Sequence, residues 1–232
     1  MAPDVVLDGR LCLFHRGERW LAAADLHHGY ELTKRLQGGL LPLWGMEALG
    51  ARLEAAIADH RPRDLILCGD IVDGQGSHAE TAAFLDVLRA LVPGHLICIA
   101  GNHDRGTIRR LVAFCETHET AGFAFHHGHL APALPPDKIR DSGHLHPTLS
   151  LHDGAGLALK VPTFLQIPAG PGQPERWVLP AFSPWAGRAR LDPIRPPASH
   201  APLGLYAETR IPVRRARYLS LTASSKVSLH PK

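Results

Sequence analysis

Five short motifs contain the residues of this chain that are best suited to metal chemistry. In order they are Asp25-Leu26-His27, Gly69-Asp70, Gly101-Asn102-His103-Asp104, His127-Gly128-His129 and Gly143-His144-Leu145-His146. Together they supply carboxylate oxygens, one amide oxygen and several imidazole nitrogens, but no thiolates. This ligand set suits a two-metal site for phosphoryl chemistry. Each short motif can occur by chance, so the prediction depends on all of them occurring in order, each beside a short apolar run.

Composition bounds the class of protein. The chain has 232 residues, of which 45% are hydrophobic and 20% charged, as in an ordinary globular protein. Its 16 histidines invite a search for metal ligands, whereas a formal charge of +3 does not by itself indicate nucleic-acid binding. None of the four cysteines forms a C-x-x-C pair, which excludes a zinc ribbon. With neither a signal-like start nor a membrane-length apolar run, we expect a cytoplasmic protein that does not bind membranes.

The apolar pattern of the first half predicts the elements that position the motifs. A hairpin is expected over 5–14, strands over 20–24, 65–68 and 95–100, and helices over 44–60 and 78–92. This alternation implies parallel strands with right-handed crossovers, and so an α/β fold. Ligands of open α/β sheets bind at the carboxyl ends of strands, so Asp25, Asp70 and Asn102 should line one sheet edge.

The second half has a different pattern. Short β-like pieces at 123–126, 148–152, 157–161, 163–167 and 177–179 predict a second, mostly antiparallel sheet packed on the first. Residues 192–204 are rich in proline and are expected to be a loop or linker, 206–221 could add a strand or a helix, and 224–232 should be a frayed tail. We therefore expect one domain over 1–190, with a Pro/Arg-rich extension over 191–232 that packs on it or trails from it.

A two-metal site needs an anionic ligand between the cations, because two close cations otherwise repel each other. Asp70 is the best candidate, since it follows a glycine at the end of a buried strand. Asp25 and His27 flank a single residue, so in extended geometry both side chains would point the same way. The same reasoning applies to His144 and His146, so the two pairs could grip metals from opposite sides.

The third motif supplies several chemical groups at once. Asn102 offers a neutral amide oxygen, while His103 and Asp104 supply an imidazole and a carboxylate that could orient it. Polar residues directly after a buried strand are hard to explain by packing. Asp73, three residues after Asp70, could support the site or belong to an ordinary turn.

In this order the motifs resemble those of the calcineurin-like metallophosphoesterase superfamily. The flanking segments 24–31, 143–147 and 179–184 are similar to a narrower group of predicted bacterial and archaeal phosphoesterases, which includes a ligase-associated DNA damage response endonuclease family. That endonuclease branch differs around the fourth motif, where this chain has His126-His127-Gly128-His129. The resemblance covers about residues 5–190 and implies a four-layer sandwich of two packed mixed β-sheets flanked by helices.

The resemblance also implies roles for individual residues. It implies two divalent metal ions, manganese first, with iron, nickel or zinc as alternatives. One ion would be held by Asp25, His27, Asp70 and His146, and the other by Asp70, Asn102, His127 and His144. His127 is preferred to His126 and His129, because the family's ligand directly precedes the small residue of that motif. His103 would be the general acid, with Asp104 as its orienting partner.

The predicted activity is hydrolysis of phosphodiester bonds, in nucleic acid or nucleotides, by attack of a hydroxide held between the metals. The alternatives are a phosphomonoesterase or nucleotide pyrophosphatase with the same metals, and a catalytically silent interaction module, which the full set of ligands disfavours. Arginines after Gly187 could follow a phosphate backbone, but a solvated basic surface explains them more simply. No interleaving of aromatic and basic residues adds to the nucleic-acid case. The sequence leaves the substrate, the native metal and the oligomeric state open.

Overall fold

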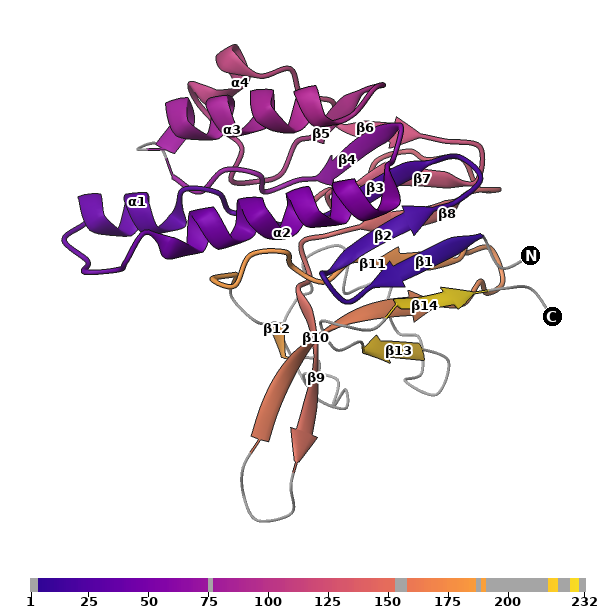
Figure 1. Cartoon of the computed structure of the whole chain (residues 1–232). Helices are drawn as coiled ribbons and strands as arrows, with labels where there is room; N and C mark the ends of the chain where they lie inside the picture. The colour runs from indigo at the N-terminus through magenta and orange to yellow at the C-terminus, as the bar shows by residue number, and fades with distance from the viewer. Residues whose placement is uncertain are drawn as a thin grey trace.

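Two mixed β-sheets pack face to face, and helices cover the outer face of one of them (Figure 1). This computed structural model describes residues 4–74, 77–152, 158–186, 189–190, 217–220 and 226–229. The first sheet has six strands in the order β14-β1-β2-β3-β4-β5. The second has eight strands, in the order β12-β9-β10-β11-β8-β7-β6 with β13 paired to β10. The α/β fold class with two packed mixed sheets is therefore confirmed.

The first sheet begins with a meander and continues as parallel strands. β1 (Val5–Asp8), β2 (Cys12–His15) and β3 (Trp20–Ala23) pair antiparallel, whereas β3, β4 (Asp64–Cys68) and β5 (Leu96–Ile99) pair parallel. The predicted helices are present as α2 (Trp44–His60) and α3 (His78–Leu91). Two short helices were not predicted, α1 (Tyr30–Leu36) and α4 (Ile108–Leu111). Each buries a single residue, so neither shows an apolar repeat in the sequence.

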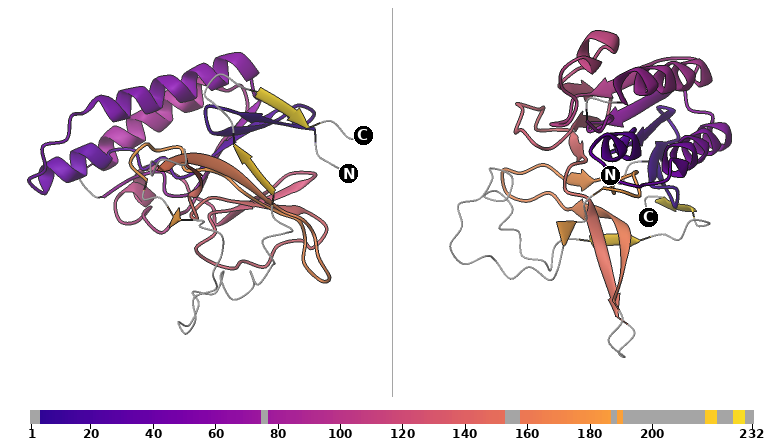
Figure 2. Two further views of the ribbon diagram at one scale, coloured as in Figure 1. Left: turned by 90° about the horizontal axis from the view of Figure 1, so that it is seen from below. Right: turned by 90° about the vertical axis from the view of Figure 1, so that its left-hand side faces the viewer.

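Two apolar cores hold the layers together. The helices pack through Leu49 and Leu53 of α2 and Leu85 of α3 onto one face of the first sheet. The other face packs on the second sheet, where the ring of Trp20 meets Phe125 edge to face at a centroid distance of 5.1 Å. In Figure 2 the long helices run side by side over the first sheet. Among the described residues no helix covers the outer face of the second sheet.

The second sheet is more mixed than the sequence analysis expected. Its strands are β6 (Thr117–Glu119), β7 (Phe123–His126), β8 (Ile139–Ser142), β9 (Pro147–His152), β10 (Ala158–Ile167), β11 (Arg176–Val178), β12 (Ala189–Arg190) and β13 (Arg217–Ser220). The β7–β8, β8–β11 and β9–β12 pairs are parallel. β10 is one strand where two pieces were predicted. Pro162 falls where the antiparallel partner of β10 changes from β9 to β11 and β13, so the proline does not break the strand.

The predicted frayed tail over 224–232 is wrong in part. Within it, β14 (Lys226–Leu229) pairs antiparallel with β1, which would otherwise be an open edge strand. Residues 206–221, left as strand or helix, contribute β13, and 192–204 lie outside the described residues. The division at residue 190 stays a prediction, although β13 and β14 each join a sheet of the first part.

Candidate metal centre

The motif residues meet at one edge of the two sheets. Asp25, Asp70 and Asn102 follow β3, β4 and β5, as the parallel-strand rule predicted. The second sheet contributes the histidines, with His127 directly after β7 and both His144 and His146 in the connection from β8 to β9. Residues from five separate segments therefore converge on one region.

The backbone at this edge is left-handed at the candidate ligands. Positive φ angles of 43° to 65° occur at Asp25, His27, Asp70, His144 and His146. The extended geometry expected for the two D/H-x-H pairs is therefore wrong, because β3 ends at Ala23 and the chain turns beyond it. A left-handed residue other than glycine costs about 1–2 kcal/mol. Clustering of such strained residues is typical of functional sites.

Hydrogen bonds and glycines fix the turns. The Asp25 N–H donates to the Gly69 carbonyl at 3.1 Å, and the His27 N–H donates to the Asp70 carbonyl at 2.9 Å. A Cβ on Gly101 would overlap the backbone and carboxylate of Asp70, and a Cβ on Gly69 would overlap the His127 ring. The glycines of the Gly-Asp and Gly-Asn motifs thus allow the ligand segments to approach each other closely.

A first group of possible ligands consists of Asp25, His27 and His146, whose ligand atoms all lie within 4.8 Å of one another. Nε2 of His146 lies 3.3 Å from Oδ1 of Asp25. Nε2 of His27 is buried and has no hydrogen-bond partner among the described residues. Such a nitrogen is costly unless a ligand or an ion satisfies it.

A second group consists of Asp70, His127 and His144, again within 4.8 Å of one another. Nε2 of His127 lies 3.1 Å from Oδ1 of Asn102 and 3.3 Å from Oδ2 of Asp70, while its Nδ1 lies 3.1 Å from the Cys68 carbonyl. When Nδ1–H donates to that carbonyl, the lone pair of Nε2 faces two acceptor oxygens. Three electron-pair donors directed at one another are suited to a divalent cation, so the residues fit a metal.

Asp70 connects the two groups. Its carboxylate also forms a ligand group with His27 and His103, and Oδ1 accepts a hydrogen bond of 2.8 Å from the His103 N–H. Burial raises the pKa of Asp70, but contacts with His127 and His103 outweigh it and hold that pKa below its usual range. Burial lowers the pKa of His127, yet Asp70 and Asp25 raise it overall. The two carboxylates thus favour the positively charged form of His127, as they would favour a bound cation.

Asp104 does not lie where the sequence analysis placed it. Its side chain is fully buried and accepts backbone N–H groups, from Ile71 at 2.9 Å and Val72 at 3.0 Å on Oδ1, and from Gly101 at 2.8 Å on Oδ2. The expected contact with the His103 imidazole does not form. Backbone amides after β4 occupy this carboxylate, so Asp104 positions the loop that carries Asp70.

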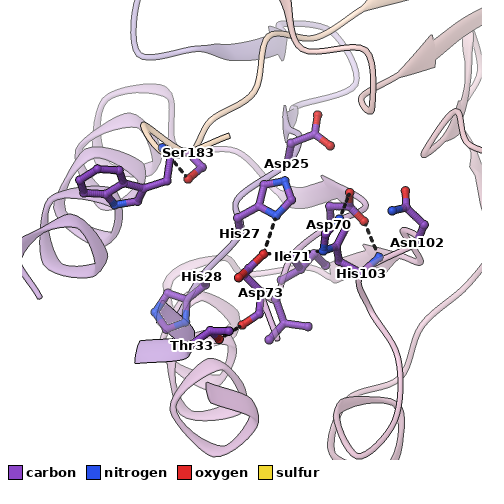
Figure 3. A network of polar contacts seen from close by, with 12 residues as sticks. Asp25, His27, His28, Thr33, Asp70, Ile71, Asp73, Asn102, His103 and Ser183 are labelled. Carbon is purple, nitrogen blue, oxygen red and sulfur yellow. Dashed lines mark hydrogen bonds and ion pairs between the residues drawn. The ribbon is translucent and has the colours of Figure 1, made fainter. Parts of the chain in front are cut away.

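Asp73 takes the position expected of Asp104. Its Oδ1 lies 3.6 Å from Nδ1 of His103 and 3.5 Å from Nδ1 of His27 (Figure 3). The His103 side chain is 45% exposed, so its other nitrogen can reach a molecule bound at the edge. The G-D-x-x-D spacing was the signal for Asp73, but spacing alone did not separate a site residue from a turn residue.

The neighbouring histidines face elsewhere. His126 is buried outside the three ligand groups and lines a small cavity with Arg140 and Arg176, and burial lowers its pKa to about 4. His129 lies with its ring 5.1 Å from that of His127 but belongs to none of the groups. Of these three histidines, only His127 belongs to one of the three ligand groups, and its role as a ligand stays a prediction.

The fold and this edge define a class of hydrolase, the metallophosphoesterases. Residues 19–170 match the sequence model of the family described as calcineurin-like phosphoesterase, which covers more than half of the chain. The chain belongs to this family. No curated protein matches. Among the described residues no helix is long and apolar enough to cross a membrane.

Two of the solved structures that match this chain differ in how similar they are to it. A nuclease named MPE from Pseudomonas putida is 25% identical, with a TM-score of 0.62 over 82% of this chain and 88% of its own. YfcE, a phosphoesterase from E. coli, is 16% identical, with a TM-score of 0.42 over 68% of this chain and 77% of its own.

Proposed function

We propose that this protein is a binuclear metal-dependent phosphodiesterase whose substrates are nucleic acids or nucleotides. The observation that carries the proposal is the place of Asp70 in two separate ligand groups, with His127 on one side and His27 on the other. A carboxylate shared between two groups is what a pair of divalent cations requires. The nuclease from Pseudomonas putida, which is similar over most of both chains, supports the diester class.

In this proposal each ion has four ligands, with nitrogen and oxygen donors only. One ion is held by Asp25, His27, Asp70 and His146, and the other by Asp70, Asn102, His127 and His144. The donor set suits manganese, our first choice, and also iron, nickel or zinc. Two bound cations would supply a nucleophile from water at neutral pH and offset charge on the phosphoryl oxygens.

The chain's own residues then control the proton and the geometry. His103 is exposed toward the edge while Asp73 faces its Nδ1 at 3.6 Å, an arrangement that orients the ring. We propose that Nε2 of His103 donates a proton to the leaving oxygen. Asp73 orients both His103 and His27, and Asp104 positions the loop that carries Asp70 by accepting its backbone N–H groups. We place the protein in the cytoplasm, a setting that suits its four free cysteines.

Hydrolysis of matched chromogenic esters tests the proposal. The metal-stripped protein is assayed on a phosphodiester and on its monoester counterpart, before and after Mn²⁺ is restored. We expect turnover only with metal and a preference for the diester. A preference for the monoester would replace the diesterase with a phosphomonoesterase. Absence of turnover on both esters and on a dinucleotide would favour the silent interaction module.

A further inference from the structure

Three aromatic rings from separate segments gather beside the metal centre. They are Tyr30 at the start of α1, Trp44 at the start of α2 and Trp185 after β11 (Figure 1). The Tyr30 and Trp185 rings stack at a centroid distance of 5.9 Å and an angle of 10°, and Trp44 contacts Trp185 at 5.6 Å and 50°. We call these three residues the aromatic platform.

The platform is held in place by a buried carboxylate. Nε1–H of Trp185 donates to Oε1 of Glu31 at 2.7 Å, and Glu31 is only 1% exposed. Gly45 of α2 packs so closely on this pair that a Cβ there would overlap the Glu31 carboxylate. The rings therefore have a fixed arrangement, which lowers the entropy cost of binding a flat ligand.

Short backbone links connect the platform to the candidate metal ligands. Tyr30 follows His27 by three residues, so their Cα atoms lie within about 11 Å of each other. The Ser183 N–H donates to the Asp25 carbonyl at 3.0 Å, and the Trp185 N–H donates to Oγ of Ser183 at 3.2 Å. A molecule with its phosphate at the metal centre thus has the rings within reach of its neighbouring groups.

The platform presents an accessible aromatic surface beside positive charge. Trp44 is 57% exposed, although tryptophan usually buries most of its surface. Lys34 lies on the same side of α1, with Nζ 5.3 Å from the centroid of the Tyr30 ring, and Arg35 follows it. Aromatic faces beside cations are the recognition elements of proteins that bind single-stranded nucleic acid.

We infer that the aromatic platform stacks unpaired nucleobases of a strand whose phosphate lies at the metal centre. The inference rests on the proposed function, because it requires a phosphodiester at that edge. Bases of a duplex already stack on each other, so the platform selects single-stranded or frayed substrates. Leu40, which is exposed on the connection between α1 and α2, is aliphatic and lacks the π face that base stacking needs.

Binding of two strands of equal charge tests the inference. A dye-labelled oligothymidylate and an abasic strand of the same length, both with cleavage-resistant phosphorothioate linkages, are titrated by fluorescence anisotropy with the Mn²⁺-loaded protein. We expect the wild-type protein to bind the base-bearing strand more tightly. Trp44→Ala should weaken that binding by about 5- to 100-fold and leave abasic binding unchanged. Trp44→Phe should restore most of the loss, because it restores an aromatic face.

Leu40→Ala is the matched control, because Leu40 is 98% exposed on the same α1–α2 connection. It should change neither affinity. An equal loss in Leu40→Ala and Trp44→Ala, or equal wild-type affinity for both strands, would overturn the inference. Binding to anionic phospholipid vesicles that is lost in Trp44→Ala, without base-dependent binding, would overturn it in favour of a membrane surface. Turnover of a diester without bases is measured separately, so failure of the proposed function is distinguishable.

Discussion

Two buried carboxylates of the first sheet each face a histidine, but their surroundings differ. Asp8 lies 2.7 Å from Nε2 of His60 and accepts 2.9 Å hydrogen bonds from the N–H and Nε–H groups of Arg10. Asp70 lies 3.3 Å from Nε2 of His127, which itself faces the amide oxygen of Asn102 at 3.1 Å. Hydrogen-bond donors thus satisfy the Asp8 carboxylate. The Asp70 carboxylate instead lies beside other atoms that carry lone pairs.

This difference distinguishes a carboxylate that stabilises the fold from one that is suited to bind a metal. The Asp8 cluster is complete with the charges that the chain supplies, so its role is to hold β1 against α2. In the Asp70 cluster, by contrast, we propose that a cation accepts the facing lone pairs. Both contain a close Asp–His pair, so the partners around the pair, and not the pair itself, identify a metal centre.

Asp70→Asn, which alters the proposed metal-binding cluster, should have the largest effect. It removes the charge that the two proposed sets of metal ligands share, and a bound metal contributes several kcal/mol of charge stabilisation. We expect phosphodiester turnover to fall by about 10⁴-fold or more. Asp8→Asn serves as the control and should keep full turnover. Comparable activity of the two variants would contradict the distinction between the clusters.

His103→Gln separates proton transfer from metal binding. We expect turnover to fall by about 10²–10⁴-fold with metal content unchanged, because a positioned general acid contributes that much. The loss should be larger for an alkyl leaving group than for a nitrophenyl group, which leaves without a proton. An equal loss on both substrates would remove His103 as the proton donor.

Asp73→Asn tests the residue that lies beside His103, where the sequence analysis had expected Asp104. Asp73 acts through His27 and His103, and loss of such an orienting carboxylate costs about 10–100-fold in metal affinity or activity. We expect a weaker apparent affinity for Mn²⁺ and a changed pH profile of turnover. If only thermal stability changed, Asp73 would be an ordinary turn residue.

Asp8→Asn should have the smallest effect on activity and a clear effect on stability. Burial raises the pKa of Asp8, but hydrogen bonds from His60 and Arg10 outweigh it and hold that pKa well below its usual range. A lowered folded pKa adds stability above about pH 3.9 that is lost as the pH falls. Urea titrations should show a loss of about 1.5–3 kcal/mol at pH 7 that shrinks below pH 4. A loss that grows toward acid pH would contradict this sign.

The strand-end positions of Asp25, Asp70 and Asn102 were predictable, because apolar runs and alternation define parallel strands locally. The role of Asp104 was not predictable, because its carboxylate accepts hydrogen bonds from backbone N–H groups 32 and 33 residues away in the sequence. Contacts between distant segments also formed the platform of Tyr30, Trp44 and Trp185. β14 was not predicted, because an alternation of apolar and polar residues over only four positions does not distinguish a strand from a frayed tail.

The most direct test of the central claim is the metal content of purified protein after loading with Mn²⁺ and removal of free ion. The account predicts two ions for each wild-type chain and two for Asp8→Asn. For Asp70→Asn it predicts loss of tight binding at both positions, because both proposed sets of four ligands contain that carboxylate. A single ion in the wild-type protein, or two ions retained in Asp70→Asn, would contradict a carboxylate-bridged binuclear centre.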